Sequence, residues 1–323
     1  MRTVFCSKQS DKIIMTIKKQ KTLNQEYVFS GKGLRTGQVA KMVLKPAGVN
    51  TGVVFHRTDL GDEAFVEAIA ENVSSTARST TIAKGEASVS TIEHLMSALA
   101  GMGVDNVIIE IDNVEVPILD GSARYYVEAF KKDGLKEQDA AKEYITLPGE
   151  IEIADEKTGS YIKVIPSETP SIDLTVDFGS KVLGVQKAHW DCGTDYSYEI
   201  APCRTFVFFH EIEYLFQNNL VKGGDVENAI VIVEHPVTKE QVDRLAGLFN
   251  VPSLEIDNNG YLNNLQLHFP DECGRHKLLD LIGDLSLAGG LVNARVEAFK
   301  PGHSINTRMA KAIREALSKL NNK

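Results

Sequence analysis

The sequence has few cysteines, no excess of positive charge and no long apolar run, and each lack excludes a class of protein. Its 323 residues include four cysteines and no Cys-x-x-Cys pair, so we expect no disulfide framework and a reducing, cytoplasmic setting. The 35 basic residues are outnumbered by 44 acidic ones, for a net charge of −9, which argues against nucleic acid or an anionic membrane as a partner. No run reaches the roughly 18 apolar residues of a membrane span, and the N-terminus lacks a signal-peptide core.

The glycine-rich segments and most of the histidines carry no clear motif. Gly31-Lys32-Gly33 and Gly223-Gly224 lack the Lys-Ser/Thr of a phosphate loop and the full dinucleotide-binding fingerprint, so we interpret both as turns. Five histidines lack an acid at a useful spacing, and we interpret them as structural or surface residues: His56, His189, His210, His235 and His268.

Two short segments carry the chemistry. His276 and Asp280 are four residues apart in an apolar-periodic run, which on a helix places both side chains on one face. An imidazole and a carboxylate so placed can hold a divalent ion. His94, in segment 90–96, would complete a three-ligand site with an open fourth position, the arrangement of a catalytic zinc. Glu93, next to a ligand, would then be placed to act as a base, so the pattern indicates a metal hydrolase.

Each pair also has a simpler interpretation. His276 with Asp280 could be an ordinary pair on a helix surface, and Glu93-His94 could lie in a solvated first helical turn, where an acid favours the helix dipole. Asp284 argues for the metal site, because it lies one turn beyond Asp280 on the same face. Burial of two uncompensated acids would be costly, and a bound dication removes this cost.

The chain divides near its middle. In the first half we expect strands at 26–30, 40–44, 52–56 and 106–111, and helices at 91–101 and 122–132, with Ser90 or Thr91 as an N-cap. In the second half we expect strands at 144–147, 151–153, 161–165 and 172–176, a hairpin turn at 156–159 and a final helix from about 306. The predicted boundaries are an extension at 1–14, domain I at 15–137, a linker at 138–142 and domain II at 143–323, with a strand–helix–strand insertion at about 201–233.

The two halves resemble each other. A shift of 182 positions places His94 on His276, Ala98 on Asp280 and Gly101 on Gly283. Each segment then continues into an asparagine and an alternating strand. This pattern predicts two similar α+β domains whose histidine-bearing helices face each other, which would bring the distant ligands to one ion.

Six stretches, in order along residues 20–315, carry a resemblance to a known family. They are 31–37 (GKGLRTG), 91–99 (TIEHLMSAL), 116–122 (VPILDGS), 204–206 (RTF), 275–284 (RHKLLDLIGD) and 301–303 (PGH). Each is weak alone, but six in order are highly specific. The chain resembles the bacterial UDP-3-O-acyl-N-acetylglucosamine deacetylases, zinc enzymes of the committed step of lipid A synthesis.

The resemblance implies a fold class and a metal. The fold is α+β: two duplicated two-layer α/β-sandwich domains, with helices packed between two outer, mostly antiparallel sheets, and an insertion in each domain. One catalytic Zn²⁺ would be held by His94, His276 and Asp280, although Fe²⁺ also suits a His₂Asp site. Glu93 would be the general base.

The resemblance also implies the remaining catalytic roles. His303 would be the general acid or a charged electrostatic partner, oriented by Asp284. Thr205 would help to hold the oxyanion, and Lys277 would contact the substrate near the reacting carbonyl. These roles agree with amide hydrolysis, which needs an activated water, a stabilised oxyanion and a proton for the leaving amine.

The implied substrate is UDP-3-O-(3-hydroxyacyl)-N-acetylglucosamine. Segment 201–233 is rich in aromatic residues, and the resemblance makes it an apolar passage for the fatty acyl chain, although core packing is the simpler interpretation. Lys277 is the first candidate for a basic contact to the uridine diphosphate, with Lys222 and Arg204 behind it. Thr205, Phe206 and Gly223 complete the expected substrate contacts.

We therefore predict a zinc-dependent deacetylase that acts as a monomer and removes acetate from the 2-acetamido group of this small molecule. The alternative is a metal-free nucleotide or phosphosugar binding protein of the same fold, and a third candidate is a catalytically silent member that only binds acyl-sugar. The stretch 182–198 is longer than expected and predicts an extra loop at the mouth of the site. The chain ends at Lys323, so we expect no second activity from the dehydratase domain that some related enzymes carry.

Overall fold

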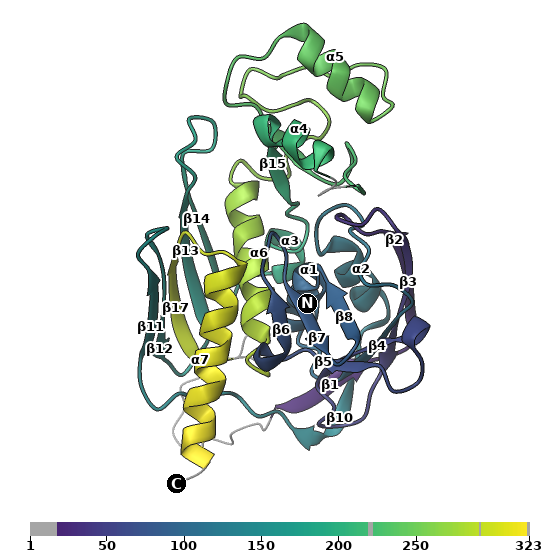
Figure 1. Cartoon of the computed structure of the whole chain (residues 1–323). Coiled ribbons are helices and arrows are strands. Elements are labelled where there is room, and N and C mark those ends of the chain that lie inside the picture. Colours follow the sequence, from purple (N-terminus) through teal and green to yellow (C-terminus); the bar gives the residue numbers. More distant parts are fainter. Residues whose placement is uncertain (1–17, 219–221, 291, 322–323) are drawn as a thin grey trace.

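Two five-stranded sheets form the outer layers of the molecule (Figure 1). The computed structural model describes residues 18–218, 222–290 and 292–321, and the extension predicted at 1–14 lies outside them. The first sheet has the order β2 (Tyr27–Lys32), β3 (Val39–Pro46), β9 (Val107–Ile111), β4 (Val53–Arg57) and β5 (Phe65–Glu67). The second has the order β11 (Ile151–Asp155), β12 (Ser160–Pro166), β17 (Ala294–Phe299), β13 (Ser171–Asp177) and β14 (Val185–Asp191).

The two sheets share one connectivity, which confirms the predicted duplication. In each, the first three strands pair antiparallel, the third and fourth pair parallel, and the fifth is antiparallel to the fourth. An alternation of apolar and polar residues gives each strand one buried face. In β3, for example, Ala40, Met42 and Leu44 are buried, and β12 buries Ile162 and Val164 in the same way.

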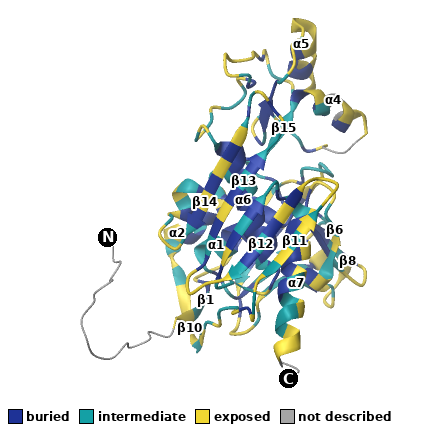
Figure 2. Ribbon diagram, turned by 90° about the vertical axis from the view of Figure 1, so that its left-hand side faces the viewer, coloured by how far each residue is buried: buried dark blue, intermediate teal, exposed yellow. Residues whose placement is uncertain are grey.

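Four helices lie between the sheets: α1 (Glu93–Met102), α2 (Arg124–Asp133), α6 (Glu272–Ser286) and α7 (His303–Asn321). α1 packs against α6, and α7 packs against α6 and β12. Most residues of α1 and α6 are buried, whereas Figure 2 shows the end of α7 near the C-terminus as intermediate and exposed. The two helices that carry the predicted ligands therefore face each other, and the α+β sandwich fold is as expected.

Each half carries an insertion. In the first half this is a small sheet of β6 (Val73–Ser75), β7 (Thr81–Lys84) and β8 (Ala87–Ser90). In the second half β15 (Phe206–Phe208), α4 (Phe209–Gln217) and β16 (Ile230–Ile232) confirm the predicted strand–helix–strand. α5 (Lys239–Leu248) packs with them in a small apolar core of its own. We call β15, α4, β16 and α5 the second insertion; it stands at the top of Figure 1, beyond both sheets.

Three other expectations differ from the structure. Residues 138–141 of the predicted linker belong to β10 (Leu135–Ala141), a polar strand paired with β1 (Lys19–Leu23) in an exposed ribbon. The strand predicted at 144–147 is wrong, since only Ile145 makes an isolated bridge there. Segment 182–198 is not an extra loop but contains β14 and the short α3 (Tyr196–Glu199), because its alternate residues pack on the helix layer.

The remaining regular elements are short. Two 3₁₀ turns, η1 (Thr58–Leu60) and η2 (Ala70–Asn72), flank β5. The turn predicted at 156–159 does connect β11 and β12 as a hairpin. Within the described ranges, no helix combines the length and apolar character needed to cross a membrane.

Candidate metal centre

The start of α1 is set by a buried carboxylate rather than by a capping hydroxyl. The helix begins after Ile92, and the cap predicted at Ser90 or Thr91 is wrong. Thr91 has a φ of 58° and donates its hydroxyl to Glu115 Oε1 at 2.8 Å. The same carboxylate accepts from main-chain N–H groups of the 31–37 loop, so this loop and the first turn of α1 are fixed together.

His94, His276 and Asp280 converge at one buried point between α1 and α6. Their ligand atoms all lie within 4.8 Å of one another. Asp280 Oδ1 is 3.7 Å from His94 Nε2 and 3.5 Å from His276 Nε2. The two imidazole rings meet edge to face, with centroids 5.0 Å apart. The helical spacing in the sequence and the facing of the two helices together produce this cluster.

The cluster fits a single metal ion. Asp280 Oδ2 accepts a hydrogen bond from Lys277 Nζ at 2.6 Å, but the buried Asp280 Oδ1 has no hydrogen-bond partner among the described residues. An unpaired buried carboxylate oxygen is costly, and a cation at the convergence would satisfy it. Two imidazole nitrogens with one carboxylate oxygen form a donor set that suits divalent transition metals.

The two histidines are in the form that binds metal. The Nδ1–H of His276 donates to the main-chain oxygen of Cys203 at 3.1 Å, which leaves Nε2 free as the ligand atom. Burial, reinforced by His276, lowers the pKa of His94 to about 3, although Asp280 opposes the shift. Burial also lowers the pKa of His276. Both rings are therefore neutral near pH 7, as ligation requires.

Asp284 organises a second group beside the ligands. Its Oδ2 accepts from His303 Nδ1 and from Asn306 Nδ2, each at 2.9 Å, and its Oδ1 accepts from Thr80 Oγ1 at 2.5 Å. Burial disfavours a charge on His303, but attraction and hydrogen bonding by Asp284 overcome it and raise the pKa of His303 to about 9. The imidazole is therefore charged and held in one orientation.

Glu93 is a buried carboxylate next to this pair. Burial raises the pKa of Glu93 to about 7, with His303 opposing the shift and Asp280 and Asp284 adding to it. The N–H of Thr80 donates to Glu93 Oε2 at 2.9 Å. A carboxyl group with a pKa near neutrality can both accept and release a proton under ordinary conditions.

A cavity of about 300 Å³ connects the ligands to the second insertion. Five predicted residues line it beside the three ligands: Glu93, Thr205, Phe206, Lys277 and His303. Its far wall is apolar and consists of Val207, Ile212, Leu215, Val231 and Phe249. The structure therefore brings the predicted catalytic residues to one cavity, with Asp284 behind His303.

Three residues predicted to contact the diphosphate or sugar are placed differently. Arg204 is buried and pairs with Glu272, with Nε 2.8 Å from Oε1, so its charge is already compensated. Lys222 is exposed, and it is not among the described residues that line the cavity. Gly223 is buried against Gly33, where a Cβ would lie 2.1 Å from the main-chain oxygen. The close approach of the Gly33 main chain explains why position 223 is a glycine.

Sequence reasoning missed four residues of the site. Thr80 and Asn306 complete the hydrogen bonds of Asp284, and no motif marks them; the only signal is that a buried acid needs partners. Arg35 and Arg78 line the cavity, whereas Arg204 does not. Arg35 lies within the GKGLRTG stretch, whereas no sequence signal marks Arg78, and its φ of 64° becomes visible only in the structure.

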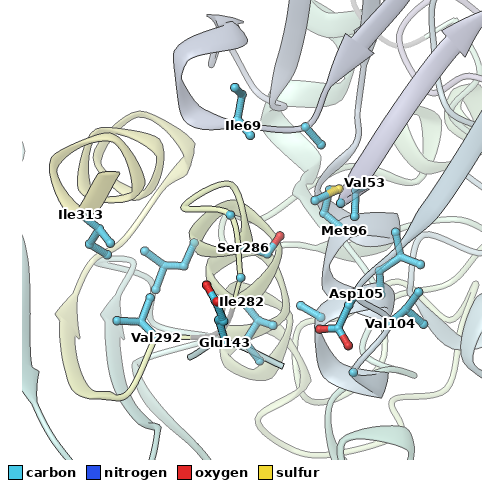
Figure 3. Close-up of a pocket in the computed structure, with 18 of the residues that line it drawn as sticks. Val53, Ile69, Met96, Val104, Asp105, Glu143, Ile282, Ser286, Val292 and Ile313 are labelled. Carbon is cyan, nitrogen blue, oxygen red and sulfur yellow. The ribbon is translucent and has the colours of Figure 1, made fainter. Parts of the chain in front are cut away.

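A larger cavity of about 760 Å³ lies apart from the metal cluster, among α1, α6 and α7 (Figure 3). Aliphatic side chains such as Met96, Ile282 and Ile313 contribute much of its surface. Asp105 on its wall is paired with Lys142 at 2.7 Å. None of the predicted site residues is among the described residues that line this larger cavity. The smaller cavity beside the metal cluster is therefore the candidate active site.

Comparisons with known proteins show which family the chain matches. A family described as "LpxC: UDP-3-O-acyl N-acetylglycosamine deacetylase" matches residues 20–247 and 247–315. The bifunctional enzyme LpxC/FabZ of Bacteroides thetaiotaomicron is 43% identical over 93% of this chain and 65% of its own length. The protein named UDP-3-O-acyl-N-acetylglucosamine deacetylase in Syntrophotalea carbinolica is 38% identical over 91% of this chain and 87% of its own length. The protein of the same name in Helicobacter hepaticus is 40% identical over 91% of this chain and 90% of its own length. The chain thus spans 65% of the length of the bifunctional relative.

Proposed function

The chain belongs to the UDP-3-O-acyl N-acetylglycosamine deacetylase family, and from this membership we propose that it removes acetate from the 2-acetamido group of UDP-3-O-(3-hydroxyacyl)-N-acetylglucosamine, in lipid A biosynthesis. The observation that carries the proposal is the buried convergence of His94, His276 and Asp280 beside Glu93 and His303.

We assign Zn²⁺ to the three ligands, with Fe²⁺ as a second ion that the same donors accept. When bound, the ion supplies Lewis-acid polarisation of the amide carbonyl and lowers the pKa of a water molecule. The unpartnered Asp280 Oδ1 supports this assignment. A metal-free nucleotide or phosphosugar binder would leave this oxygen uncompensated, so nothing in the site favours that alternative.

The chain's own residues would move the protons. Glu93 takes a proton from the attacking water, because its raised pKa of about 7 makes it a stronger base than an ordinary carboxylate. His303, kept charged by Asp284, donates its Nε2 proton to the departing sugar amine, or stabilises negative charge before it does so. The hydroxyl of Thr205 and the ammonium of Lys277 face the same cavity and would donate hydrogen bonds to the developing oxyanion and the substrate.

The rest of the cavity would bind the two ends of the substrate. The apolar wall of the second insertion would contact the fatty acyl chain, as Phe206 and its neighbours were expected to do. For the diphosphate, Arg35 and Arg78 are better placed than Lys222 or Gly223, since both residues line the cavity. Arg78 also contacts Glu211 at 3.2 Å, but this pair is partly exposed, unlike the buried pair of Arg204 with Glu272. The proposal retains a monomer and a cytoplasmic setting, which the free Cys203 and Cys273 support. It places the boundary between the two domains after β10, whose last residue is Ala141.

The test is acetate release by the purified chain from the UDP-acyl-sugar. We expect activity in the metal-loaded protein, its loss after a chelator, and its return when Zn²⁺ is added. Full activity of a protein shown by metal analysis to be metal-free would overturn the proposal. A His276→Ala variant that bound zinc as tightly as the parent would overturn the ligand assignment alone.

A further inference from the structure

Three side chains of the second insertion converge at a second place, away from the cavity. The ligand atoms of His210, Glu234 and His235 all lie within 4.8 Å of one another. Sequence spacing did not reveal this group, because 24 positions separate His210 from Glu234. The convergence exists only in the folded insertion.

Strand pairing explains the convergence. β15 and β16 run parallel, with Phe208 opposite Ile232 at their ends. His210 and Glu234 each lie two residues beyond this last pair. Because the strands are parallel, both residues follow the C-terminal ends of the strands on the same side of the small sheet. His235 is the next residue after Glu234. The ring of His210 stacks on Phe208, with centroids 5.6 Å apart and planes 26° apart. The His235 ring lies 5.7 Å from that of His210.

We propose that His210, Glu234 and His235 bind a second divalent transition-metal ion of the zinc type. Two imidazoles and one carboxylate are a donor set that such ions accept, and hard ions such as Mg²⁺ disfavour imidazole. Both histidines are exposed and Glu234 is partly buried, so the ion keeps water in its open positions. Binding is therefore weaker than at the buried site between α1 and α6.

The ion would stabilise the fold of the second insertion. The β15–β16 sheet has two strands of three residues each, and a sheet of this size is marginally stable alone. The insertion packs around a small apolar cluster separate from the main core. Small modules of this kind commonly gain stability from a bound metal. A metal at the strand ends would close the loop between them.

The same elements form the apolar wall of the cavity. Val207 of β15, Ile212 and Leu215 of α4, and Val231 of β16 line it. An ion that fixes the ends of β15 and β16 therefore reduces the motion of this wall. The second site would thus couple metal supply to the rigidity of the wall, without supplying a ligand to the reaction.

The experiment uses the full chain, stripped with a chelator and titrated with Zn²⁺ by calorimetry, with metal analysis after gel filtration. We expect about two ions per chain in the parent and about one in a His210→Ala/His235→Ala double variant. His189→Ala is the matched control. His189 is also an exposed histidine between two acids, but Asp173 and Asp191 contact opposite ring nitrogens and do not converge, so this variant keeps both ions.

A second readout is hydrogen exchange. The second equivalent of Zn²⁺ should slow amide exchange in α4 and β16 of the parent and of His189→Ala, and leave the double variant unchanged. The milder variant Glu234→Gln should weaken the binding of the second equivalent of Zn²⁺. It therefore tests the site even if the double variant is poorly folded. His276→Ala separates this site from the first, since it should lose the buried ion and keep the exposed one. One ion in the parent, or two in the double variant, would refute the second site and leave the proposed function untouched.

Discussion

A Cβ at Gly283 of α6 would lie 2.1 Å from the main-chain oxygen of Glu93 in α1. The same Cβ would lie 3.0 Å from the N atom of Ser97. The two helices therefore touch backbone to backbone at the turn that carries Glu93 and His94. Because α6 carries the other two ligands, this contact fixes the distance between the halves of the metal site.

Gly283→Ala should therefore separate α1 from α6. We expect a loss of about 3 kcal/mol in the free energy of unfolding, the upper range for an overpacked core position, and weaker metal binding. Gly247→Ala is the control, because Gly247 also lies in a helix but is exposed and has open space around its Cβ position. It should be stabilising by about 0.5–1 kcal/mol. Denaturant unfolding of both variants measures the difference, and equal effects would contradict the contact.

Asp284→Asn should change the pH profile. The carboxylate raises the pKa of His303 to about 9 against the effect of burial, so its removal leaves burial to lower that pKa. An acid that must be protonated then loses its proton at lower pH, and the alkaline limb of kcat/KM should move down by about one pH unit or more. Asp173→Asn, at an exposed position of β13, is the control. A limb that stayed in place would show that His303 is not the group that titrates.

Glu93→Gln should separate catalysis from metal binding. The amide oxygen can still accept the N–H of Thr80, so the fold of the first turn is kept, but it cannot take a proton from water. We expect kcat to fall by about 10²–10⁴-fold with the zinc content unchanged. Loss of zinc together with activity would instead mean that Glu93 supports the ligands.

Removal of the metal should lower stability. The buried Asp280 Oδ1 then lacks a partner, and the ligand that favours the folded state is gone. We expect the melting temperature to fall on chelation and to rise with free Zn²⁺ concentration. The free energy of unfolding should increase by about 4 kcal/mol when free Zn²⁺ is 1,000 times the dissociation constant. Calorimetry on the parent and on His276→Ala measures this. A similar response in the variant would place the stabilising ion elsewhere, and the second insertion is the place to look.

Leu215→Ala should alter chain-length preference. Leu215 is 2% exposed and lines the apolar wall, so its truncation removes contacts that only a long acyl chain can make. KM should rise for a long-chain substrate and change little for a short-chain one. Leu248→Ala, at an exposed position of α5, should leave both values unchanged. Equal changes for long and short chains would remove this wall as the acyl contact.

Local spacing predicted the parts of the site that lie on single elements. His276 and Asp280 share a helix face because they are four residues apart, and the duplication places His94 on the equivalent helix. Alternation located most strands of both sheets. These features depend only on helical and strand periodicity, which the sequence carries directly.

The features that sequence reasoning missed depend on tertiary placement. Thr91 looked like a helix cap, but its backbone turns its hydroxyl toward Glu115 instead. Thr80 reaches Asp284 across 204 positions. His210 and His235 looked isolated because only the pairing of β15 with β16 brings them to Glu234. In each case the partner is distant in the chain and no local pattern marks it.

In each sheet the central strand is the last to be synthesised: β9 enters between β3 and β4, and β17 enters between β12 and β13. Each follows its ligand helix directly, so on the ribosome the first sheet can close as soon as α1 and β9 have emerged. The second must wait for α6 and β17, long after β14. A nascent chain would therefore carry one finished half presenting Glu93 and His94 with no partner surface. The ion could be captured only after α6, with His276 and Asp280, has also emerged, which makes metal loading a late step in the folding of these two halves.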